Sequence, residues 1–312
     1  MPDPVIIEVA INGATTKAQN PNVPISEDEI VADALACFDA GTAIVHHHIA
    51  GTGLSGPEAA EVYLGVWRRV LPQRPDALWY PTINIGPSAA WYDHITPLAE
   101  SGLLRMSLSD PGSVNLGSPP GAVPSGRFVY ANSFDSINHQ FALCHEHGLG
   151  PSLAIYEPGF LRVVLDHHRA GRLPAGTFVK LYLCGERGLA GARFGLPPTR
   201  RALDAYLELL DGTGLVWAVS AVGDDVTALE VCADALAAGG HLHIGLEFFG
   251  GDRTPTNVEL VEHAVKAAAD AGRPVATPDD AATILALPRD SHPSVGGHPS
   301  VDVGDLRPPT LR

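Results

Sequence analysis

Three consecutive histidines, His46 to His48, end the apolar run AIVHHHIA and are followed by a glycine-rich segment. Successive side chains of a β-strand point to opposite faces, so His46 and His48 share one face and His47 lies on the other. Two imidazoles at this spacing can bind one metal ion, and zinc commonly takes histidine nitrogens with an acidic third ligand. The spacing therefore predicts a site for Zn²⁺, or another divalent cation, at His46 and His48. In the alternative, these two side chains only form hydrogen bonds with their neighbours.

A carboxylate for the third position occurs much later in the chain, in the segment HLHIGLEFF. His241, His243, Gly245 and Glu247 alternate onto one face of a strand, and Glu247 is the last of them. We expect Glu247 to be the third metal ligand, although a carboxylate paired with an arginine would give the same pattern. His243 lies deeper on the same face. It is a candidate base or carboxylate-binding group, and equally an ordinary core histidine.

The elements that must position these residues alternate between short apolar runs and longer helical patterns. The apolar runs predict eight strands, at residues 5–11, 43–48, 77–83, 104–108, 152–156, 178–183, 215–220 and 241–246. The intervening patterns predict eight helices, at residues 26–40, 57–70, 91–101, 133–147, 158–170, 199–210, 225–238 and 256–271. The first helix opens with SEDE, a capping serine followed by acidic residues that complement the helix dipole.

Eight strand–helix pairs predict an α/β fold, a single (β/α)₈ TIM barrel over residues 1–287. An open doubly wound sheet is the alternative, but no GxGxxG follows the first strand. Catalytic groups of such barrels lie on the loops after the strands, so the two histidines and Glu247 should meet at one rim. Residues 288–312 are rich in proline and glycine and predict a tail, either flexible or wrapped around a neighbouring subunit.

The same rule gives further candidate residues at the rim, mostly hydroxyl and amide side chains that could contact a polar ligand. These candidates are Thr15 after the first strand, Thr82 and Asn84 after the third, and Ser109, Asp110 and Ser113 after the fourth. The glycine-rich loop after the sixth strand adds Arg187 and Arg193, which could bind an anionic group. For each of these residues, plain turn chemistry or a solvated side chain is the competing interpretation.

Composition excludes some classes of function. The formal charge of −15 and the pI near 5.2 argue against a nucleic-acid-binding groove, which needs a basic face. The four cysteines form no CxxC pair, which is typical of free thiols in a reducing cytosol. The N-terminus lacks a signal-peptide pattern, and no apolar run reaches membrane-spanning length. We therefore expect a soluble cytoplasmic protein that acts on small molecules.

An ordered set of segments makes the chain similar to a known family. The segments are AINGATTKAQNPNVPISEDEI, GTAIVHHHIA, GSVNLG, YEPGF, WAVSAVG, GGHLHIGLE and NVELVEHAVKAAADAGRPVATPDDAATIL. With them the chain resembles the β-keto acid cleavage enzymes, whose founding activity is 3-keto-5-aminohexanoate cleavage. The resemblance implies a zinc-dependent TIM barrel, usually a homotetramer. It also implies a retro-Claisen type exchange, in which a β-keto acid and acetyl-CoA give acetoacetate and a new acyl-CoA.

Carried over to this sequence, the family's zinc ligands fall on His46, His48 and Glu247, and its hydroxyl after strand three falls on Thr82. Other positions depart from the family pattern. An acidic residue of the strand-one loop is replaced by Ala14, a glutamate before YExG by Ala154, and an arginine and an aspartate after HxH by Ala50 and Gly51. Where the family writes HxRxGxEDN, this chain has His243 for the arginine and Phe248 for the aspartate.

These departures change the expected chemistry. Zinc can polarise the carbonyls of a β-keto acid, but Phe248 cannot transfer a proton, so another base such as His243 or Asp110 is needed. We expect a metal-dependent carbon–carbon lyase or acyltransferase for a β-keto acid with an apolar substituent, which Phe248 would contact. Two alternatives remain: a metal-binding barrel with a binding or regulatory role and no CoA chemistry, and a zinc-dependent hydrolase or aldolase.

Overall fold

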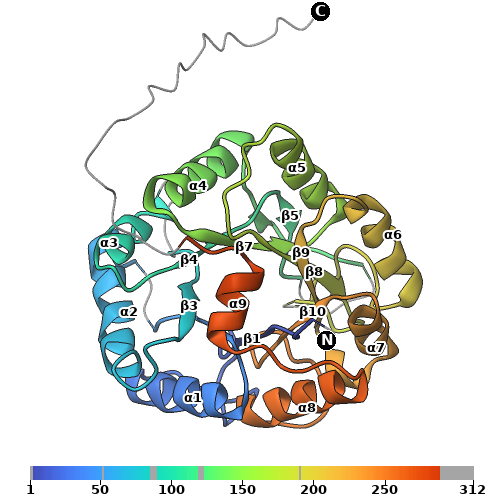
Figure 1. The fold of residues 1–312 in the computed structure, drawn as a ribbon, viewed down its shortest axis with the longest axis horizontal. Helices are drawn as coiled ribbons and strands as arrows, with labels where there is room; N and C mark the ends of the chain where they lie inside the picture. The colour runs from blue at the N-terminus through green and yellow to red at the C-terminus, as the bar shows by residue number, and fades with distance from the viewer. Residues whose placement is uncertain (1–2, 51–52, 85–89, 119–122, 190, 289–312) are drawn as a thin grey trace, which may run out of the picture.

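A computed structural model describes residues 3–50, 53–84, 90–118, 123–189 and 191–288 of the protein. Parallel strands form a ring that is surrounded by helices (Figure 1). The ring strands are β1 (Ile7–Ala10), β2 (Ile44–His47), β3 (Leu78–Pro81), β4 (Met106–Ser109), β7 (Gly150–Ile155), β8 (Phe178–Cys184), β9 (Val216–Val222) and β10 (His241–Ile244). The helices are α1 (Glu27–Ala40), α2 (Gly56–Val70), α3 (Ile95–Glu100), α4 (Phe134–His147), α5 (Pro158–Arg169), α6 (Arg200–Leu210), α7 (Glu230–Ala237), α8 (Asn257–Asp270) and α9 (Pro278–Ile284).

The strand order confirms the predicted TIM barrel. The eight-stranded sheet runs β3-β2-β1-β10-β9-β8-β7-β4, and the paired strands are parallel. Its two end strands, β3 and β4, lie next to each other, so the sheet nearly closes on itself (Figure 1). β1 pairs with both β2 and β10, with Ala10 opposite His46 and Val9 opposite Ile244. This pairing brings the end of the second strand to the end of the eighth.

Each predicted strand and helix has a counterpart in the structure, with three differences. The helix expected at 91–101 forms only over Ile95–Glu100. The helix expected at 225–238 is split into a short 3₁₀ turn, Val226–Ala228, and α7, because Leu229 between them is extended. Two elements were not predicted, the helix α9 and a hairpin of β5 (Val114–Asn115) and β6 (Val129–Tyr130).

Serine and threonine caps fix where the helices begin. The side chain of Ser26 accepts from the backbone N–H of Glu29, and the Glu29 carboxylate accepts from the backbone N–H of Ser26. The SEDE signal is therefore a complete capping box. Ser55 with Glu58 and Thr256 with Glu259 repeat this arrangement at α2 and α8. Because these helices follow β1, β2 and β10, their caps fix the chain just beyond the strands that carry the candidate ligands.

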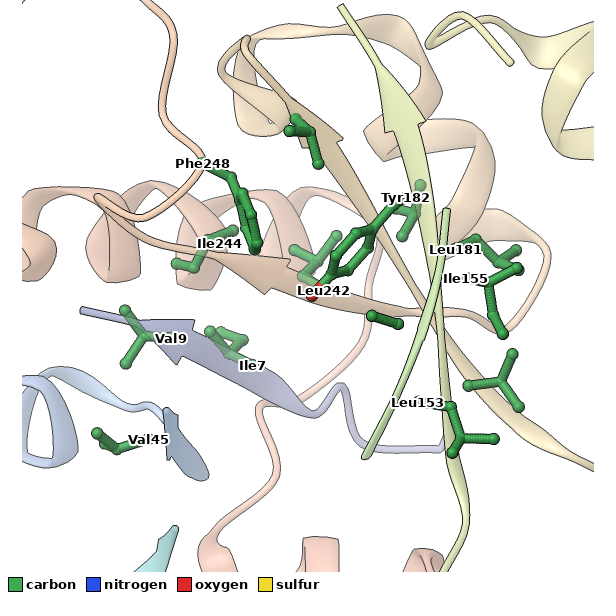
Figure 2. Close-up of a cluster of buried hydrophobic side chains, with 14 of the residues drawn as sticks. Ile7, Val9, Val45, Leu153, Ile155, Leu181, Tyr182, Leu242, Ile244 and Phe248 are labelled. Carbon is green, nitrogen blue, oxygen red and sulfur yellow. The ribbon is translucent and has the colours of Figure 1, made fainter. Parts of the chain in front are cut away.

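Two apolar clusters hold the barrel together. The larger one lies between the sheet and the helices and includes Val9, Val45, Leu242 and Ile244 (Figure 2). The second fills the floor of the barrel, where inward side chains of the strands pack against α9. Its buried members are Ile6, Ala43, Ile44, Leu78, Tyr80, Met106, Leu108, Phe178, Ala218, Ala276, Ala281, Leu285 and Leu287. The floor is therefore a packed apolar plug, and the polar groups gather toward the other end.

The four cysteines are free thiols and all are buried, as the sequence predicted. Among the residues that the structure describes, no helix is long and apolar enough to cross a membrane. Of the predicted tail, residues 289–312 lie outside the described residues.

Candidate metal centre and its pocket

His46, His48 and Glu247 come together at the carboxyl end of the strands. Glu247 Oε2 lies 3.4 Å from His46 Nε2, and Glu247 Oε1 lies 3.2 Å from His48 Nε2. One potential ligand atom from each residue lies within 4.8 Å of the others, and the part of the chain that the structure describes contains no second such group. The predicted ligand set is thus assembled from β2 and from the loop after β10, two segments far apart in the sequence.

The ring of His46 is held in one orientation by Tyr80 of β3. His46 Nδ1 lies 3.2 Å from the carbonyl oxygen of Tyr80, and the two rings stack with their centroids 4.4 Å apart. With Nδ1–H donating to this carbonyl, the lone pair on Nε2 is left for a metal, the usual second-sphere arrangement of a histidine ligand. Burial also lowers the pKa of His46 well below its ordinary value, which keeps the imidazole neutral.

Asn12, two residues after the end of β1, fixes the backbone of His48. Its Oδ1 accepts from the His48 backbone N–H at 2.8 Å, and its Nδ2 donates to the His48 carbonyl at 3.0 Å. His47 points to the other face, where its Nε2 accepts from Trp67 Nε1–H of α2 at 2.9 Å. The alternation expected of a strand is therefore present: two histidines face the centre, and the third packs between sheet and helix.

Glycines make room for Glu247. A Cβ atom on Gly13 would lie 2.1 Å from Glu247 Cγ, and Gly13 has a positive φ of 55°. Gly245, with φ of 127°, packs directly on the backbone of Ala10. The hydroxyl of Thr15 donates to the Leu246 carbonyl at 2.7 Å, and the Glu247 N–H donates to the Ala10 carbonyl at 3.1 Å. The carboxylate is consequently held by a tight strand-end turn against the loop after β1.

The three residues fit a divalent cation. His48 Nε2 and Glu247 Oε2 are buried and have no hydrogen-bond partner among the described residues. Leaving buried polar atoms unpaired costs free energy, so a ligand for them is expected. Two imidazole nitrogens and one carboxylate form a donor set suited to zinc and to other first-row divalent ions, with a coordination position left open.

A cluster of buried polar side chains lies in the barrel interior around Glu8 of β1. Glu8 Oε1 accepts from the hydroxyl of Tyr80 and from Nζ of Lys180, which lies 3.2 Å away. Its other oxygen, Oε2, lies 3.5 Å from the Ser152 hydroxyl. Glu8 and Lys180 are both fully buried. Burial raises the pKa of Glu8, and the neighbouring Lys180 opposes that shift.

His243 belongs to this interior cluster. Its Nε2 lies 3.3 Å from Glu8 Oε1, and its ring stacks on Tyr182 with centroids 5.3 Å apart. The side chain has no exposed surface, and Phe248 covers it at 5.6 Å between ring centroids. Burial lowers its pKa well below the ordinary value. His243 is therefore a neutral imidazole enclosed by aromatic rings, and its role as a base stays a prediction.

Asp110, at the end of β4, has the properties of a base that works near neutral pH. Its Oδ2 accepts from the hydroxyl of Tyr130, while Oδ1 is buried without a partner among the described residues. Gln140 of α4 accepts from the Asp110 backbone N–H at 2.9 Å and so fixes its position. Burial raises the pKa of Asp110 to about 6, with the Tyr130 hydrogen bond opposing the shift.

A pocket of about 400 Å³ opens beside Glu247. Its walls come from the loops after β1, β8, β9 and β10 and include Ala14, Thr15, Leu246, Phe248 and Phe249. Arg187 also lines it but donates to the Gly250 carbonyl and to Asp252. Arg253, the other cation of the wall, is paired with Asp225 at 2.8 Å. The charges of this wall are therefore matched, apart from Glu247 itself.

The remaining predicted residues are Thr82, Asn84, Ser113, Ser109 and Arg193. Thr82 and Asn84 line a small pocket together with His48, although the Asn84 amide donates to the Leu54 carbonyl at 2.9 Å. The hydroxyl of Ser113 donates to the Asn132 carbonyl at 3.1 Å in the β5–β6 hairpin.

Two predicted substrate contacts are directed at other side chains of the protein. The Ser109 side chain is fully buried with its Oγ 4.0 Å from Cys144 Sγ of α4, and its role as a substrate contact stays a prediction. Alternation along β4 turns Ser109 toward the helices while Asp110 turns inward. Arg193 is exposed and pairs with Glu186 at 2.7 Å.

Several residues that organise this site were not predicted, namely Glu8, Tyr80, Lys180 and Tyr130. For Glu8 and Lys180 a signal was present, because each is a charged residue inside an otherwise apolar strand, and charges in such positions are rarely unpaired. Tyr80 and Tyr130 carry no comparable signal. Tyrosine is common in strands, and what these two contact depends on partners distant in the chain.

Comparison with known proteins shows which family the chain resembles. The family model described as beta-keto acid cleavage enzyme matches residues 4–287. A 3-keto-5-aminohexanoate cleavage enzyme of Fusobacterium nucleatum is 25% identical over 92% of this chain and 99% of its own length. A 3-oxoadipate:acetyl-CoA acetyltransferase of Cupriavidus necator is 25% identical over 92% of this chain and 96% of its own.

Among solved structures, apo ObcA superposes with a TM-score of 0.65 at 15% identity, over 86% of this chain and 66% of ObcA, which supports the barrel fold. By name, these two relatives are a cleavage enzyme and an acetyltransferase, which is consistent with the lyase or acyltransferase predicted for this chain. With a family model that extends over nearly all of its described length, the chain belongs to the β-keto acid cleavage enzyme family.

Proposed function

We propose that this protein cleaves a β-keto acid with an uncharged, apolar substituent, in exchange with acetyl-CoA, giving acetoacetate and a new acyl-CoA. The observation that carries the proposal is the meeting of His46, His48 and Glu247, where Glu247 lines a pocket whose two arginines are both paired. The three residues would hold a divalent cation, Zn²⁺ in the first place. When bound, the cation acts as a Lewis acid on the carbonyl oxygens of the substrate.

The pocket wall supports an uncharged substituent. The named substrates of two relatives carry an amino group, as in 3-keto-5-aminohexanoate, or a second carboxyl group, as in 3-oxoadipate. A buried charge of either sign needs a partner. In this pocket Arg187 and Arg253 are paired with Asp252 and Asp225. Phe248, Phe249 and Ala14 offer apolar surface instead.

Proton transfer falls to Asp110 in this proposal. Its free Oδ1 would accept the proton, while the hydroxyl of Tyr130 holds Oδ2 in place. A pKa of about 6 leaves the carboxylate ionised but still basic near neutral pH, which suits a general base. His243 is the second candidate. Neither of its ring nitrogens has a hydrogen-bond partner among the described residues, although Nε2 lies 3.3 Å from Glu8 Oε1. Thr82 beside His48 would orient the substrate through its hydroxyl.

The direct test is product analysis with a set of β-keto acids. Purified protein loaded with Zn²⁺ is incubated with acetyl-CoA and keto acids that carry alkyl, phenyl, amino or carboxyl substituents, and acyl-CoA products are identified by mass spectrometry. We expect alkyl or phenyl substrates to be turned over with kcat/KM at least about 100-fold higher than charged ones. Acyl-CoA formed from charged substrates alone would refute the proposed specificity.

A matched pair of variants makes the test sharper. Phe248→Leu keeps the wall apolar and should preserve the preference for uncharged substrates. Phe248→Asp adds a carboxylate beside Glu247 and should lower the rate with them. It should also favour a substrate with an amino group, which could pair with the new charge. If both variants kept the wild-type preference, Phe248 would have no part in selecting the substituent.

The response to acetyl-CoA distinguishes the proposed function from two others. A binding or regulatory barrel would form no product, and acetyl-CoA would not raise its melting temperature, whereas a ligand that binds the folded state must do so. A zinc-dependent hydrolase or aldolase would consume the keto acid without acetyl-CoA. The release of acyl-CoA only when acetyl-CoA is supplied supports the exchange.

Some expectations stay predictions from the sequence. They are a single barrel domain over residues 1–287, a tail over 288–312, a homotetramer and a cytoplasmic location. Light scattering of the purified protein would give the subunit number. Metal analysis of the protein as purified would identify the bound cation.

A further inference from the structure

The proposed reaction leaves the buried ion pair of Glu8 and Lys180 without a role. The two side chains have no exposed surface, and Lys180 Nζ lies 3.2 Å from Glu8 Oε1. Lys180 also donates to the Tyr80 hydroxyl at 2.5 Å, and that hydroxyl donates to Glu8. Apolar side chains of similar size often stabilise a core as well as a buried ion pair does, so packing alone does not account for this pair.

The hydrogen bonds indicate that Glu8 is ionised. Its Oε1 accepts from two donors, the Tyr80 hydroxyl and the Lys180 ammonium. An oxygen that meets two donors is an acceptor, as in a carboxylate, and not the hydroxyl of a protonated acid. The cluster therefore contains one buried anion and one buried cation.

Tyr80 connects this pair to the metal ligands. The Tyr80 ring stacks on the ring of His46, with the two centroids 4.4 Å apart. The Lys180 ammonium lies 4.8 Å from the centroid of the same Tyr80 ring. Fields at such separations are weakly screened inside a protein. The pKa directions agree with this coupling. Burial is the main cause of the lowered pKa of His46, and Lys180 lowers it further; Glu247 in turn adds to the raised pKa of Glu8.

We propose that the Glu8–Lys180 pair sets the affinity of the His46, His48 and Glu247 site for its cation. Glu8 attracts the cation from beneath and Lys180 repels it, so each residue acts with opposite sign on the same site. Both are positioning residues, because neither touches the cation. The inference rests on the proposed function for the metal site, but not on which keto acid is cleaved.

The test measures Zn²⁺ affinity by competition with a chromophoric chelator at pH 8, without substrate. Glu8→Gln leaves Lys180 uncompensated and should weaken Zn²⁺ binding about 10- to 100-fold, the range for partners outside the ligand set. Lys180→Met leaves Glu8 uncompensated and should tighten binding about tenfold. Shifts of opposite sign support the proposal. Shifts of the same sign, or affinities within about twofold of the wild-type value, overturn it.

The double variant Glu8→Gln with Lys180→Met covers the case in which a single variant does not fold, because it leaves no buried charge unpaired. Its Zn²⁺ affinity should stay within about threefold of the wild-type value, since the two removed charges cancel. Lys180→Arg keeps the charge and should also stay within threefold. A tenfold loss in the double variant would show that the cluster acts through its hydrogen bonds and not through charge, and would overturn the inference.

Matched controls lie on the surface of α8, where Lys266 and Asp270 form an exposed pair. Lys266→Met and Asp270→Asn remove the same charges far from the barrel interior and should leave the affinity unchanged. The absorption spectrum of the Co²⁺-loaded protein gives a second measurement, because its bands should move in the single variants and return in the double variant. Failure of the proposed reaction would appear differently, as Zn²⁺ bound normally with no acyl-CoA formed.

Discussion

The two ends of the barrel contrast sharply. At the floor, Ile6, Leu78 and Phe178 belong to one apolar cluster with Leu285, the residue after α9. At the opposite rim, His48 Nε2, Glu247 Oε2 and Asp110 Oδ1 are buried without hydrogen-bond partners among the described residues. Apolar packing of the first kind stabilises a fold, whereas unpaired polar atoms of the second kind cost stability unless a ligand satisfies them. We therefore propose that the floor maintains the shape of the barrel and that the rim carries out the chemistry.

The largest effect is expected from His46→Ala, which removes one ligand of the rim. Two remaining ligands should not retain a stoichiometric cation, so metal content and acyl-CoA formation should both be lost. The neighbouring substitution His47→Leu is the control. It breaks the Trp67 contact and should lower the free energy of unfolding by about 1–3 kcal/mol while the metal stays bound. If His46→Ala still bound one zinc per chain in elemental analysis, the ligand assignment would be wrong.

Asp110→Asn comes next, because it removes the proposed base but leaves the metal ligands unchanged. The rate should fall about 10²- to 10⁴-fold with zinc content preserved. In the wild-type protein, kcat/KM should fall as the pH drops below about 6, where Asp110 gains a proton and can no longer accept one. That acidic limb should vanish from the residual activity of Asp110→Asn. A wild-type profile that is flat from pH 5 to pH 8, the range chosen for the assay, would contradict this role.

Phe178→Ala tests the floor. Phe178 is fully buried, and its loss should lower the free energy of unfolding by about 3–5 kcal/mol because a cavity replaces a packed ring. Urea titration monitored by circular dichroism gives this value. At temperatures where the variant stays folded, zinc affinity and kcat/KM should change little. Loss of metal affinity without loss of stability would mean that the floor takes part in metal binding and does not only stabilise the fold.

Ser109→Ala should have the smallest effect. The side chain faces α4 and has only a distant contact with Cys144. We expect the free energy of unfolding to change by less than about 1 kcal/mol, and kcat/KM should stay within about twofold of the wild-type value. Steady-state kinetics with the best keto acid would measure this. A tenfold loss in kcat/KM would support Ser109 as a substrate contact.

The same contrast explains what could be predicted from the sequence. The alternation of apolar strands and amphipathic helices is local, and it was enough to give the barrel. The meeting of His46, His48 and Glu247 followed from one rule of barrel geometry, since strand ends share a rim. The hairpin of β5 and β6 was missed because two-residue strands carry too little pattern to recognise.

Specific side-chain contacts between distant strands could not be predicted from the sequence. Lys180 and Glu8 are 172 positions apart, and no local pattern states that their side chains meet. The hydroxyls of Thr15 and Ser113 were predicted to face a ligand, yet each donates to a backbone carbonyl. Whether a hydroxyl is free depends on where unpaired carbonyls end up in the folded chain, and that is settled by tertiary structure.

The central claim is that one cation binds where β2 and the loop after β10 converge. A crystal structure of the zinc-loaded protein, with anomalous diffraction recorded at the zinc edge, measures this directly. The account predicts one peak with Nε2 of His46 and of His48 at about 2.0–2.1 Å and an oxygen of Glu247 at about 2.0–2.2 Å. A crystal saturated with zinc in which the peak lies elsewhere, and Glu247 contacts only protein, would contradict it.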